Sequence, residues 1–198
     1  MGMKDSAACR RRLILAAAER LLGHYGPSKT TVADIARAAE VGVGTIYLEF
    51  PSKDAILIAL SEQRYAAILA AMEAAATSEA PHAERLRLLL ERRVDGFLAL
   101  AEHGEHAVDL VHCGACPAIR SARVDFETRE RALLEGLLRD GAAAGAFTCD
   151  DAPATIAAAI LQAFTAFAPP VLYARPAEQV RAELAILHRL LLVGLARR

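Results

Sequence analysis

The stretch from residue 31 to residue 57, TVADIARAAEVGVGTIYLEFPSKDAIL, decides the fold. Thr31 is followed three residues later by an aspartate, a pattern close to a capping box, which predicts a short helix over 32–39. Gly42 predicts a tight turn, and the residues after it predict a second short helix over 43–49. Two short helices joined across a glycine turn, with a third helix before them, are typical of a helix-turn-helix unit.

Helical periodicity continues on both sides of this stretch, where apolar residues recur at spacings of three and four. Further helices are therefore expected over residues 6–22, 53–77, 84–101, 120–143, 154–168 and 177–196. The chain of 198 residues contains 44 Ala and 27 Leu, which are strong helix formers and argue against an all-β or a doubly wound α/β fold. We predict an all-α protein of about nine helices, with a helix-turn-helix domain over 1–54, a connecting fourth helix over 53–77 and a larger domain over 55–198.

Composition also restricts the class of protein. A hydrophobic content of 55% with a net charge of -1 excludes a disordered chain. Residues 152–174 carry no charge, but three prolines and several polar groups interrupt them, so we expect a buried helix there and no membrane span. The N-terminus lacks the apolar stretch of a secretory signal, so we expect a cytoplasmic protein whose four cysteines are reduced.

The helix-turn-helix pattern suits DNA because a short helix can present its first turn to the major groove while its partner braces it. Residues 1–54 carry 8 Lys and Arg against 6 Asp and Glu, whereas the remainder carries 15 against 18. This asymmetry permits a DNA-facing N-terminal module without demanding one. Spacing by itself leaves open a helical enzyme or an interaction module that does not bind DNA. We find no catalytic or phosphate-binding motif that favours an enzyme.

Three blocks together resemble the DNA-binding domain of TetR/AcrR-type repressors: residues 31–36 (TVADIA), 41–47 (VGVGTIY) and 50–57 (FPSKDAIL). The resemblance covers about residues 11–60, and the three blocks occur in the family's order and spacing. It implies a helical C-terminal domain that binds a ligand and dimerises. We therefore expect a homodimeric repressor that binds a near-palindromic double-stranded operator and is released by a small-molecule effector, with no required cofactor.

The resemblance also implies roles for individual residues. Thr31 and Lys53 correspond to phosphate contacts, and Tyr47 corresponds to an aromatic residue whose hydroxyl reaches the DNA backbone. The first turn of the recognition helix, which faces base edges, consists of Val43, Gly44 and Thr45. Core positions of the three-helix unit are expected at Ile35, Val41, Ile46 and Phe50.

The chain departs from the family pattern at several positions. Gly42 replaces a capping serine, and Leu48 and Glu49 stand where aromatic or basic side chains are common. Glu49 near phosphates would be repelled unless it turns away or accepts a hydrogen bond from cytosine. Residues 10–12, three consecutive arginines, offer either a basic arm or a solvated helix start.

Two sets of residues in the C-terminal half are candidates for the ligand and the dimer. An apolar effector cavity is predicted from Leu89, Val94, Phe97, Leu98, Val111, Leu137, Ile160 and Phe164. A dimer interface built as a four-helix bundle is predicted from Ile156, Ile160, Phe164, Phe167, Leu184 and Leu191.

The segment over 103–116 is unusually rich in metal-ligating side chains. Its candidates for a metal or redox site are His106, His112, Cys113 and Cys116, with His103, Asp109 and the later Cys149 as possible companions. Imidazole and thiolate are ligands for zinc and copper(I), and a Cys-x-x-Cys pair can form a reversible disulfide. Thiol-redox or electrophile sensing, metal sensing and simple packing of these residues all remain open.

Overall fold

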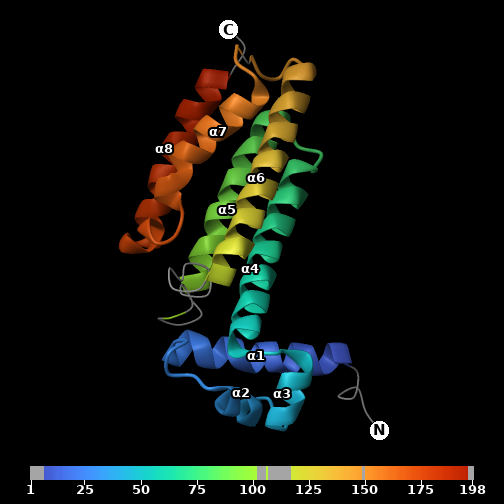
Figure 1. Ribbon diagram of the computed structural model, residues 1–198. Coiled ribbons are helices and arrows are strands. Elements are labelled where there is room, and N and C mark those ends of the chain that lie inside the picture. The colour runs from blue at the N-terminus through green and yellow to red at the C-terminus, as the bar shows by residue number, and fades with distance from the viewer. Residues whose placement is uncertain (1–6, 102–105, 107–116, 149, 196–198) are drawn as a thin grey trace. The chain divides into compact units, whose positions relative to one another are not determined.

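A computed structural model describes residues 7–101, 106, 117–148 and 150–195, and within these ranges the chain is helical without strands (Figure 1). The elements are α1 (Ala7–Tyr25), α2 (Val32–Ala38), α3 (Val43–Glu49), α4 (Lys53–Ala76), α5 (His82–Ala101), α6 (Pro117–Ala143), α7 (Pro153–Ala163), the 3-10 turns η3 (Phe164–Phe167) and η4 (Val171–Ala174), and α8 (Ala177–Leu195). The prediction of an all-α protein is confirmed, and the helix positions agree closely with the periodicity.

The apolar residues 152–174 do not contain the single helix predicted over 154–168. Helix α7 ends at Ala163, and the chain continues as two 3-10 turns around Pro169 and Pro170. Proline has no N–H to donate and restricts the residue before it, so the α-helix cannot continue through this pair.

At 11 residues, α7 is too short to cross a bilayer. Helix α4 is long and apolar enough to do so, with half of its most apolar stretch buried inside the protein, a property that long core helices share.

The described residues form two compact units. The first contains those within 1–65 and 99–123, and the second those within 66–98 and 124–198. Helices α4, α5 and α6 each contribute to both units, because each runs through a boundary without a break. The division that we predicted between residues 54 and 55 separates the helix-turn-helix from its neighbour by function and stays a prediction.

The first unit is built around the packing of α1, α2, α3 and the beginning of α4. Its buried cluster includes Ile35, Ile46 and Phe50, with Val41 partly buried against it, as expected from the sequence. Ile119 of α6 joins the same cluster. The unit therefore has its own apolar core, which holds the two short helices of the helix-turn-helix in place.

The second unit is a bundle in which parts of α4, α5 and α6 run side by side, with α7 and α8 along them (Figure 1). Helices α4 and α5 approach closely at Gly96, where a Cβ atom would lie 2.7 Å from the Ile68 side chain. Phe97 of α5 packs edge-to-face on Phe126 of α6, with ring centroids 5.7 Å apart.

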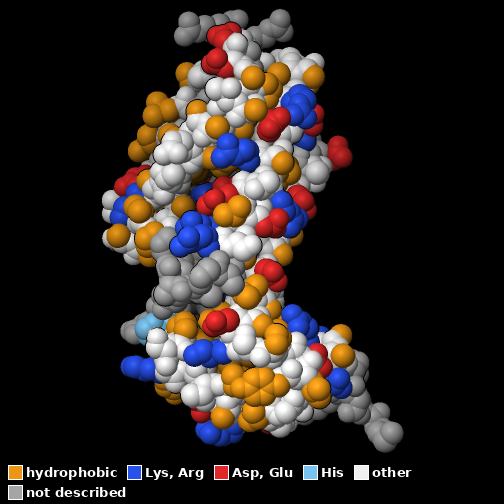
Figure 2. Space-filling view, viewed as in Figure 1, with side chains coloured by type: hydrophobic (Ala, Val, Ile, Leu, Met, Phe, Trp, Pro, Cys, Tyr) orange, Lys and Arg blue, Asp and Glu red, His pale blue; other side chains and the backbone are white. Residues whose placement is uncertain are grey.

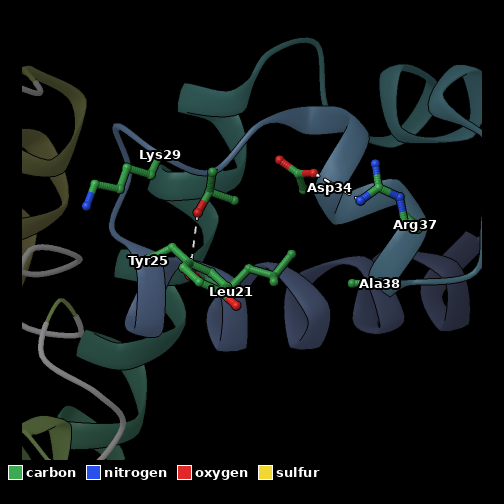
Figure 3. A pocket seen from close by; sticks show the side chains of 7 residues that line it. Leu21, Tyr25, Lys29, Asp34, Arg37 and Ala38 are labelled. Atoms are coloured by element: carbon green, nitrogen blue, oxygen red, sulfur yellow. Dashed lines mark hydrogen bonds and ion pairs between the residues drawn. The ribbon is translucent and has the colours of Figure 1, made fainter.

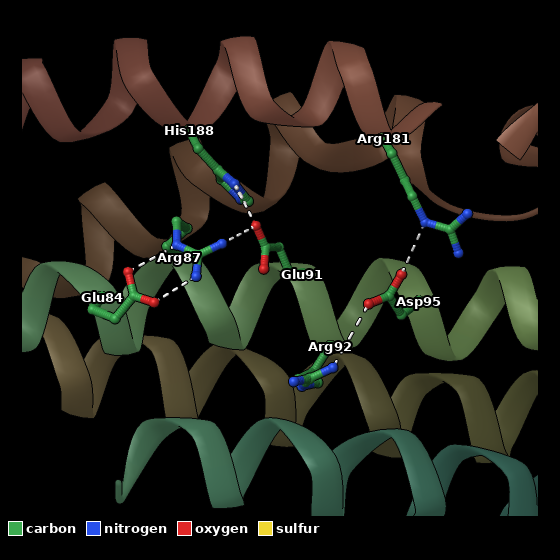
Figure 4. Close-up of polar contacts among 7 residues, drawn as sticks. All are labelled: Glu84, Arg87, Glu91, Arg92, Asp95, Arg181 and His188. Atoms are coloured by element: carbon green, nitrogen blue, oxygen red, sulfur yellow. Dashed lines mark hydrogen bonds and ion pairs between the residues drawn. The ribbon is translucent and has the colours of Figure 1, made fainter. Parts of the chain in front are cut away.

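Polar contacts add to the apolar packing between α5 and α8 (Figure 4). Arg181 of α8 pairs with Asp95 of α5 at 3.5 Å. His188 of α8 is buried, stacks on Phe164 and lies 3.7 Å from a carboxylate oxygen of Glu91. Neither ring nitrogen has a hydrogen-bond partner among the described residues. Burial lowers the pKa of His188, so the neutral imidazole is the favoured form in the folded protein.

Candidate DNA-binding surface and ligand pocket

The start of α2 is fixed by a reciprocal cap between Thr31 and Asp34, which confirms the capping predicted from the sequence. The Asp34 N–H donates to the Thr31 hydroxyl oxygen at 3.2 Å, and the Thr31 N–H donates to the Asp34 carboxylate at 3.1 Å. The Thr31 hydroxyl also donates to this carboxylate at 2.6 Å. These hydrogen bonds hold the pKa of Asp34 below its ordinary value, the hydroxyl contributing most. The Thr31 side chain is exposed, so its second role as a phosphate contact is sterically open.

The outer side of α3 presents apolar and aromatic groups to solvent. Val43 is 43% exposed, Tyr47 is 54% exposed and Leu48 is 87% exposed. Gly44 is also exposed, and a Cβ atom built there would meet nothing within 4 Å. Val43, Tyr47 and Leu48 are close together on this short helix, and neighbouring exposed apolar groups mark a binding surface more often than single ones do. The predicted base-facing turn is therefore accessible, and Leu48 is a further candidate contact whose role the family pattern did not suggest.

The inner side of α3 is held by two arginines of α1. Arg10 pairs with the Glu49 carboxylate at 3.1 Å, and the Glu49 side chain is only 12% exposed. Arg11 donates to the Glu49 carbonyl at 3.1 Å and places its guanidinium 4.1 Å from the centre of the Phe50 ring. Glu49 thus turns away from the exposed face, and Arg10 and Arg11 serve to anchor α3.

Lys53, at the first position of α4, closes the loop between α1 and α2. Its ammonium group donates to the carbonyl of Pro27 at 2.7 Å and to that of Thr30 at 3.2 Å. An ammonium group has three N–H donors, so two hydrogen bonds to the protein leave one for a phosphate. The sequence suggested only the phosphate role, because the loop carbonyls that Lys53 binds are not visible in a linear motif.

A pocket of about 400 Å³ lies between the end of α1 and α2 (Figure 3). Its lining includes Leu21, Tyr25 and Ala38, with Lys29, Asp34 and Arg37 as its charged members. Arg37 lies 3.4 Å from the Asp34 carboxylate and is 79% exposed. Arg37 belongs to the last turn of α2 and reaches back to Asp34, whereas the Lys29 side chain points away from both (Figure 3). Sequence reasoning did not select Lys29 or Arg37.

His106 is the one described member of the candidate metal or redox set. Its backbone N–H donates to the Gly23 carbonyl at 3.0 Å, and its ring lies against Gly26, where a Cβ atom would come within 3.1 Å of the ring. Gly26 has a φ of 79°, which other residues rarely adopt. His106 therefore docks on the end of α1. His112, Cys113, Cys116, His103, Asp109 and Cys149 lie outside the described residues, and the described part of the chain contains no metal-binding cluster.

The apolar residues predicted to line an effector cavity pack as core of the second unit. Leu89, Val94, Phe97, Leu98, Leu137, Ile160 and Phe164 are all buried, and Val111 lies outside the described residues. None of them lines the pocket between α1 and α2 or the charged pocket of the C-terminal half. Their role around a ligand stays a prediction.

A second pocket, of about 360 Å³, lies in the C-terminal half and is charged. It is lined by Arg93 of α5, by Glu127, Glu130 and Arg131 of α6, and by Ala158, Leu161, Gln162, Thr165, Ala168 and Pro169. Arg93 and Glu130 form a buried ion pair at 2.7 Å. Burial raises the pKa of Glu130, against the opposing effect of Arg93.

Four of the six residues predicted for the dimer interface are unavailable to a partner. Ile160, Phe164, Phe167 and Leu184 are buried within the chain. Ile156 and Leu191 are partly buried, and the dimer interface itself stays a prediction. Helix α8 carries apolar residues on both sides, and periodicity does not say which side meets the core. The exposed side of α8 carries Ile186 at 50%, Leu190 at 67% and Val193 at 77% exposure. Orange side chains gather over α8 in Figure 2.

Comparison with known proteins agrees with this architecture. Residues 14–60 match the family model described as bacterial regulatory proteins, tetR family. A fatty acid metabolism regulator protein of Bacillus subtilis (strain 168) is 29% identical over 125 residues, which cover 63% of this chain and 60% of that relative. The match thus spans less than two thirds of the relative's length.

Solved structures share the fold over nearly the whole chain. The fatty acid degradation regulator FadR from Bacillus halodurans superposes with a TM-score of 0.72 at 23% identity, covering 96% of this chain and 97% of its own. A protein assigned to the TetR family from Mesorhizobium loti MAFF303099 has a TM-score of 0.79 at 18% identity, covering 96% and 98%. Identities this low establish the likeness of fold alone.

Proposed function

Because residues 14–60 belong to the TetR family of bacterial regulatory proteins, we propose that this chain is a ligand-responsive repressor that binds a near-palindromic operator as a homodimer in the cytoplasm. The observation that carries the proposal is the exposed first turn of α3, held in place by a separate apolar core. Entry into the major groove requires a recognition helix that DNA can reach and that the rest of its domain supports from behind.

The candidate contact residues divide into two functional sets, in which Thr45 and Lys53 are partly buried and the others are exposed. Val43, Gly44, Thr45 and Leu48 face base edges, where an apolar side chain can contact a thymine methyl group. Thr31, Tyr47 and Lys53 contact phosphates, together with Lys29 before α2 and Arg37 in its last turn. The first set determines the operator sequence, and the second determines affinity and its dependence on salt.

The exposed side of α8 supports the proposed dimer. Ile186, Leu190 and Val193 recur at helical spacing and form an apolar stripe. A second copy of the chain is the occupant we assign to it, since one recognition helix reads only a few base pairs and two half-sites are needed for specificity. Exposed alanines on α7, such as Ala159 and Ala163, are small enough to allow close approach of a partner helix.

The dimer is tested by sedimentation velocity on a pair of matched variants. Leu190→Glu should convert the dimer to a monomer, because it places a charge in the centre of the interface. Val124→Glu, on α6, makes the same change at a residue that is 51% exposed and outside the stripe, and it should leave the dimer intact. A wild-type protein that sediments as a monomer at micromolar concentration contradicts the proposal.

DNA binding is tested by fluorescence anisotropy on fragments from the protein's own promoter, followed by footprinting of the bound fragment. The name of the Bacillus subtilis relative makes promoters of fatty acid metabolism genes the next DNA to examine. We expect a protected region with two symmetric half-sites about one or more helical turns apart. Equal affinity for these fragments and for random DNA at physiological salt argues for a helical module without operator recognition.

We place the small-molecule effector in the C-terminal half of the chain, where its binding lowers operator affinity. We assign the coupling to α4, which contributes to both compact units and, unlike α5 and α6, directly follows the helix-turn-helix in the chain; the ligand must then prefer a conformation in which α4 is displaced. Release of operator by a compound, with a linked loss of compound affinity in the presence of operator, is the expected result. Sensing by Cys113 and Cys116 predicts instead that a peroxide or an electrophile releases operator and that Cys→Ser variants do not respond.

A further inference from the structure

The side of α3 that faces solvent is largely apolar. Its exposed residues are Val43, Gly44, Tyr47 and Leu48. At about 100° per residue, these four positions fall within an arc of about 140° around the helix. Ile46 lies outside this arc and is buried in the core of the first unit. One continuous face of α3 therefore presents two aliphatic side chains, a bare backbone position and a tyrosine ring.

Few groups on α3 are able to recognise a base by hydrogen bonds. The helix has the sequence VGTIYLE and carries no Arg, Lys, Asn or Gln, the side chains that bind guanine or adenine through paired hydrogen bonds. Its one charged residue is Glu49, whose carboxylate is held by Arg10 at 3.1 Å with the side chain mostly buried. The Thr45 hydroxyl is partly buried, and a hydroxyl both donates and accepts, so it distinguishes bases poorly.

The edges of the bases offer one apolar group in the major groove, the methyl group of thymine. The other three bases present hydrogen-bonding atoms there, for which an aliphatic side chain has no partner. Contact with a thymine methyl group removes apolar surface from water, and burial of one such group corresponds to about fourfold in affinity. An aliphatic helix face therefore favours thymine.

We propose that α3 recognises its operator through thymine methyl groups, with Leu48 and Val43 as the residues that contact them. The DNA beneath α3 is then A·T-rich, and its recognition does not depend on hydrogen bonds to guanine. Gly44 leaves space between these two side chains, because a Cβ atom there meets nothing of the protein within 4 Å. The inference rests on the proposed function, since it specifies the DNA that the recognition helix binds.

The test begins with selection of bound sequences from a randomised duplex library by the full-length protein. The selected half-sites should contain thymine at the positions that α3 covers. Replacing such a thymine by deoxyuridine removes the methyl group and keeps the base pair. One replacement in each half-site should weaken binding about fifteenfold, as two fourfold losses.

Two further base analogues separate methyl contacts from hydrogen bonds. Exchange of the same thymine for 5-methylcytosine, with guanine opposite, should retain more affinity than exchange for cytosine, because 5-methylcytosine carries the methyl group at the same place. Replacing guanine in the half-sites by 7-deazaguanine removes a major-groove acceptor and should leave the affinity nearly unchanged.

Variants of α3 assign the contacts to residues. Leu48→Ala should abolish the response to deoxyuridine at one position of each half-site, and Val43→Ala should do so at another. Leu48→Arg should change the selected base at the first of these positions to guanine. Leu48 and Val43 are both exposed, so these variants should keep the wild-type Tm. Val124→Ala on α6 makes the same exchange as Val43→Ala at a similarly exposed valine and should leave the deoxyuridine response unchanged.

The outcomes distinguish this inference from the proposed function. Equal affinity for the thymine and deoxyuridine operators would overturn the inference and leave operator binding intact. A larger loss with 7-deazaguanine than with deoxyuridine would also overturn it, in favour of hydrogen bonds from a cation such as Arg37. An unchanged deoxyuridine response in both Leu48→Ala and Val43→Ala would refute their assignment as the contacting residues. A library from which no sequence is enriched would contradict the proposed function itself.

Discussion

Substituting Gly44 by alanine separates the needs of the fold from the needs of DNA binding. Gly44 lies in the first turn of α3, and a Cβ atom there meets nothing within 4 Å in the protein. Alanine is favoured over glycine in a helix by about 0.8–1.0 kcal/mol in the interior, and by somewhat less in a first turn. Gly44→Ala should therefore raise the free energy of unfolding by about 0.5–1 kcal/mol, which corresponds to an increase in Tm of about 2–4 °C at most.

The effect on DNA should have the opposite sign. Gly44 stands on the exposed face of α3 beside Val43 and Tyr47, so a methyl group added there points into the space that DNA occupies. If the backbone of Gly44 approaches the DNA closely, the methyl group displaces the helix and weakens neighbouring contacts. We expect at least a tenfold loss of operator affinity, about 1.4 kcal/mol.

The assay pairs thermal unfolding with fluorescence anisotropy on operator DNA, using Gly136→Ala as the control. Gly136 lies inside α6, and a Cβ atom there also meets nothing within 4 Å. The control should gain stability without any change in DNA affinity. Unchanged or tighter operator binding by Gly44→Ala would refute the close approach of α3 at this residue, and a loss of stability would refute the open space around it.

Three other substitutions test separate parts of the structure. Lys53→Ala should reduce affinity equally for operator and random DNA, and it should flatten the salt dependence of binding by about one unit of slope. Loss of its two hydrogen bonds to loop carbonyls should lower the free energy of unfolding by about 1 kcal/mol. A change in sequence preference at constant salt slope would contradict the phosphate role. His188→Leu should remove a pH dependence of the free energy of unfolding. Burial lowers the pKa of His188 in the folded protein, where Glu91 and Arg87 of α5 face it, so unfolding takes up a proton. The wild type should therefore lose stability as the pH falls below about 6.5. Urea titrations from pH 8 to 5 measure this, and an equal pH slope in the variant would show that other groups cause it. Glu40→Gly should raise stability by about 1 kcal/mol, because Glu40 has a φ of 56° that costs a side chain more than it costs glycine; a lower urea midpoint would mean that the contacts of Glu40 outweigh this strain.

Local chemistry made much of the DNA-binding domain predictable from the sequence. The pairing of Thr31 with Asp34 acts over three residues, and Gly42 and Phe50 bound α3 through the backbone itself. The core positions Ile35 and Ile46 follow from helical periodicity. The sequence could not place Glu49, because its partner Arg10 lies 39 residues away.

The C-terminal half was predictable in its helices and not in its surfaces. Helix α8 is apolar around much of its circumference, so the sequence alone could not say that Leu184 faces the core and Leu190 faces solvent. In the same way, the sequence does not distinguish Arg93 from the other charged residues of α5. Only tertiary packing brings Glu130 of α6 within 2.7 Å of it and forms the ion pair.

The sequence by itself determined the all-α class, the helix-turn-helix and the match of residues 14–60 to the TetR family, because helix propensity, capping and a compact motif are local properties that survive without the rest of the chain. Tertiary structure decided which apolar residues are core, where the charged pocket lies and that Lys53 closes a loop. These depend on contacts between residues far apart in the chain, and many alanine- and leucine-rich helices satisfy the same local rules while packing on different faces.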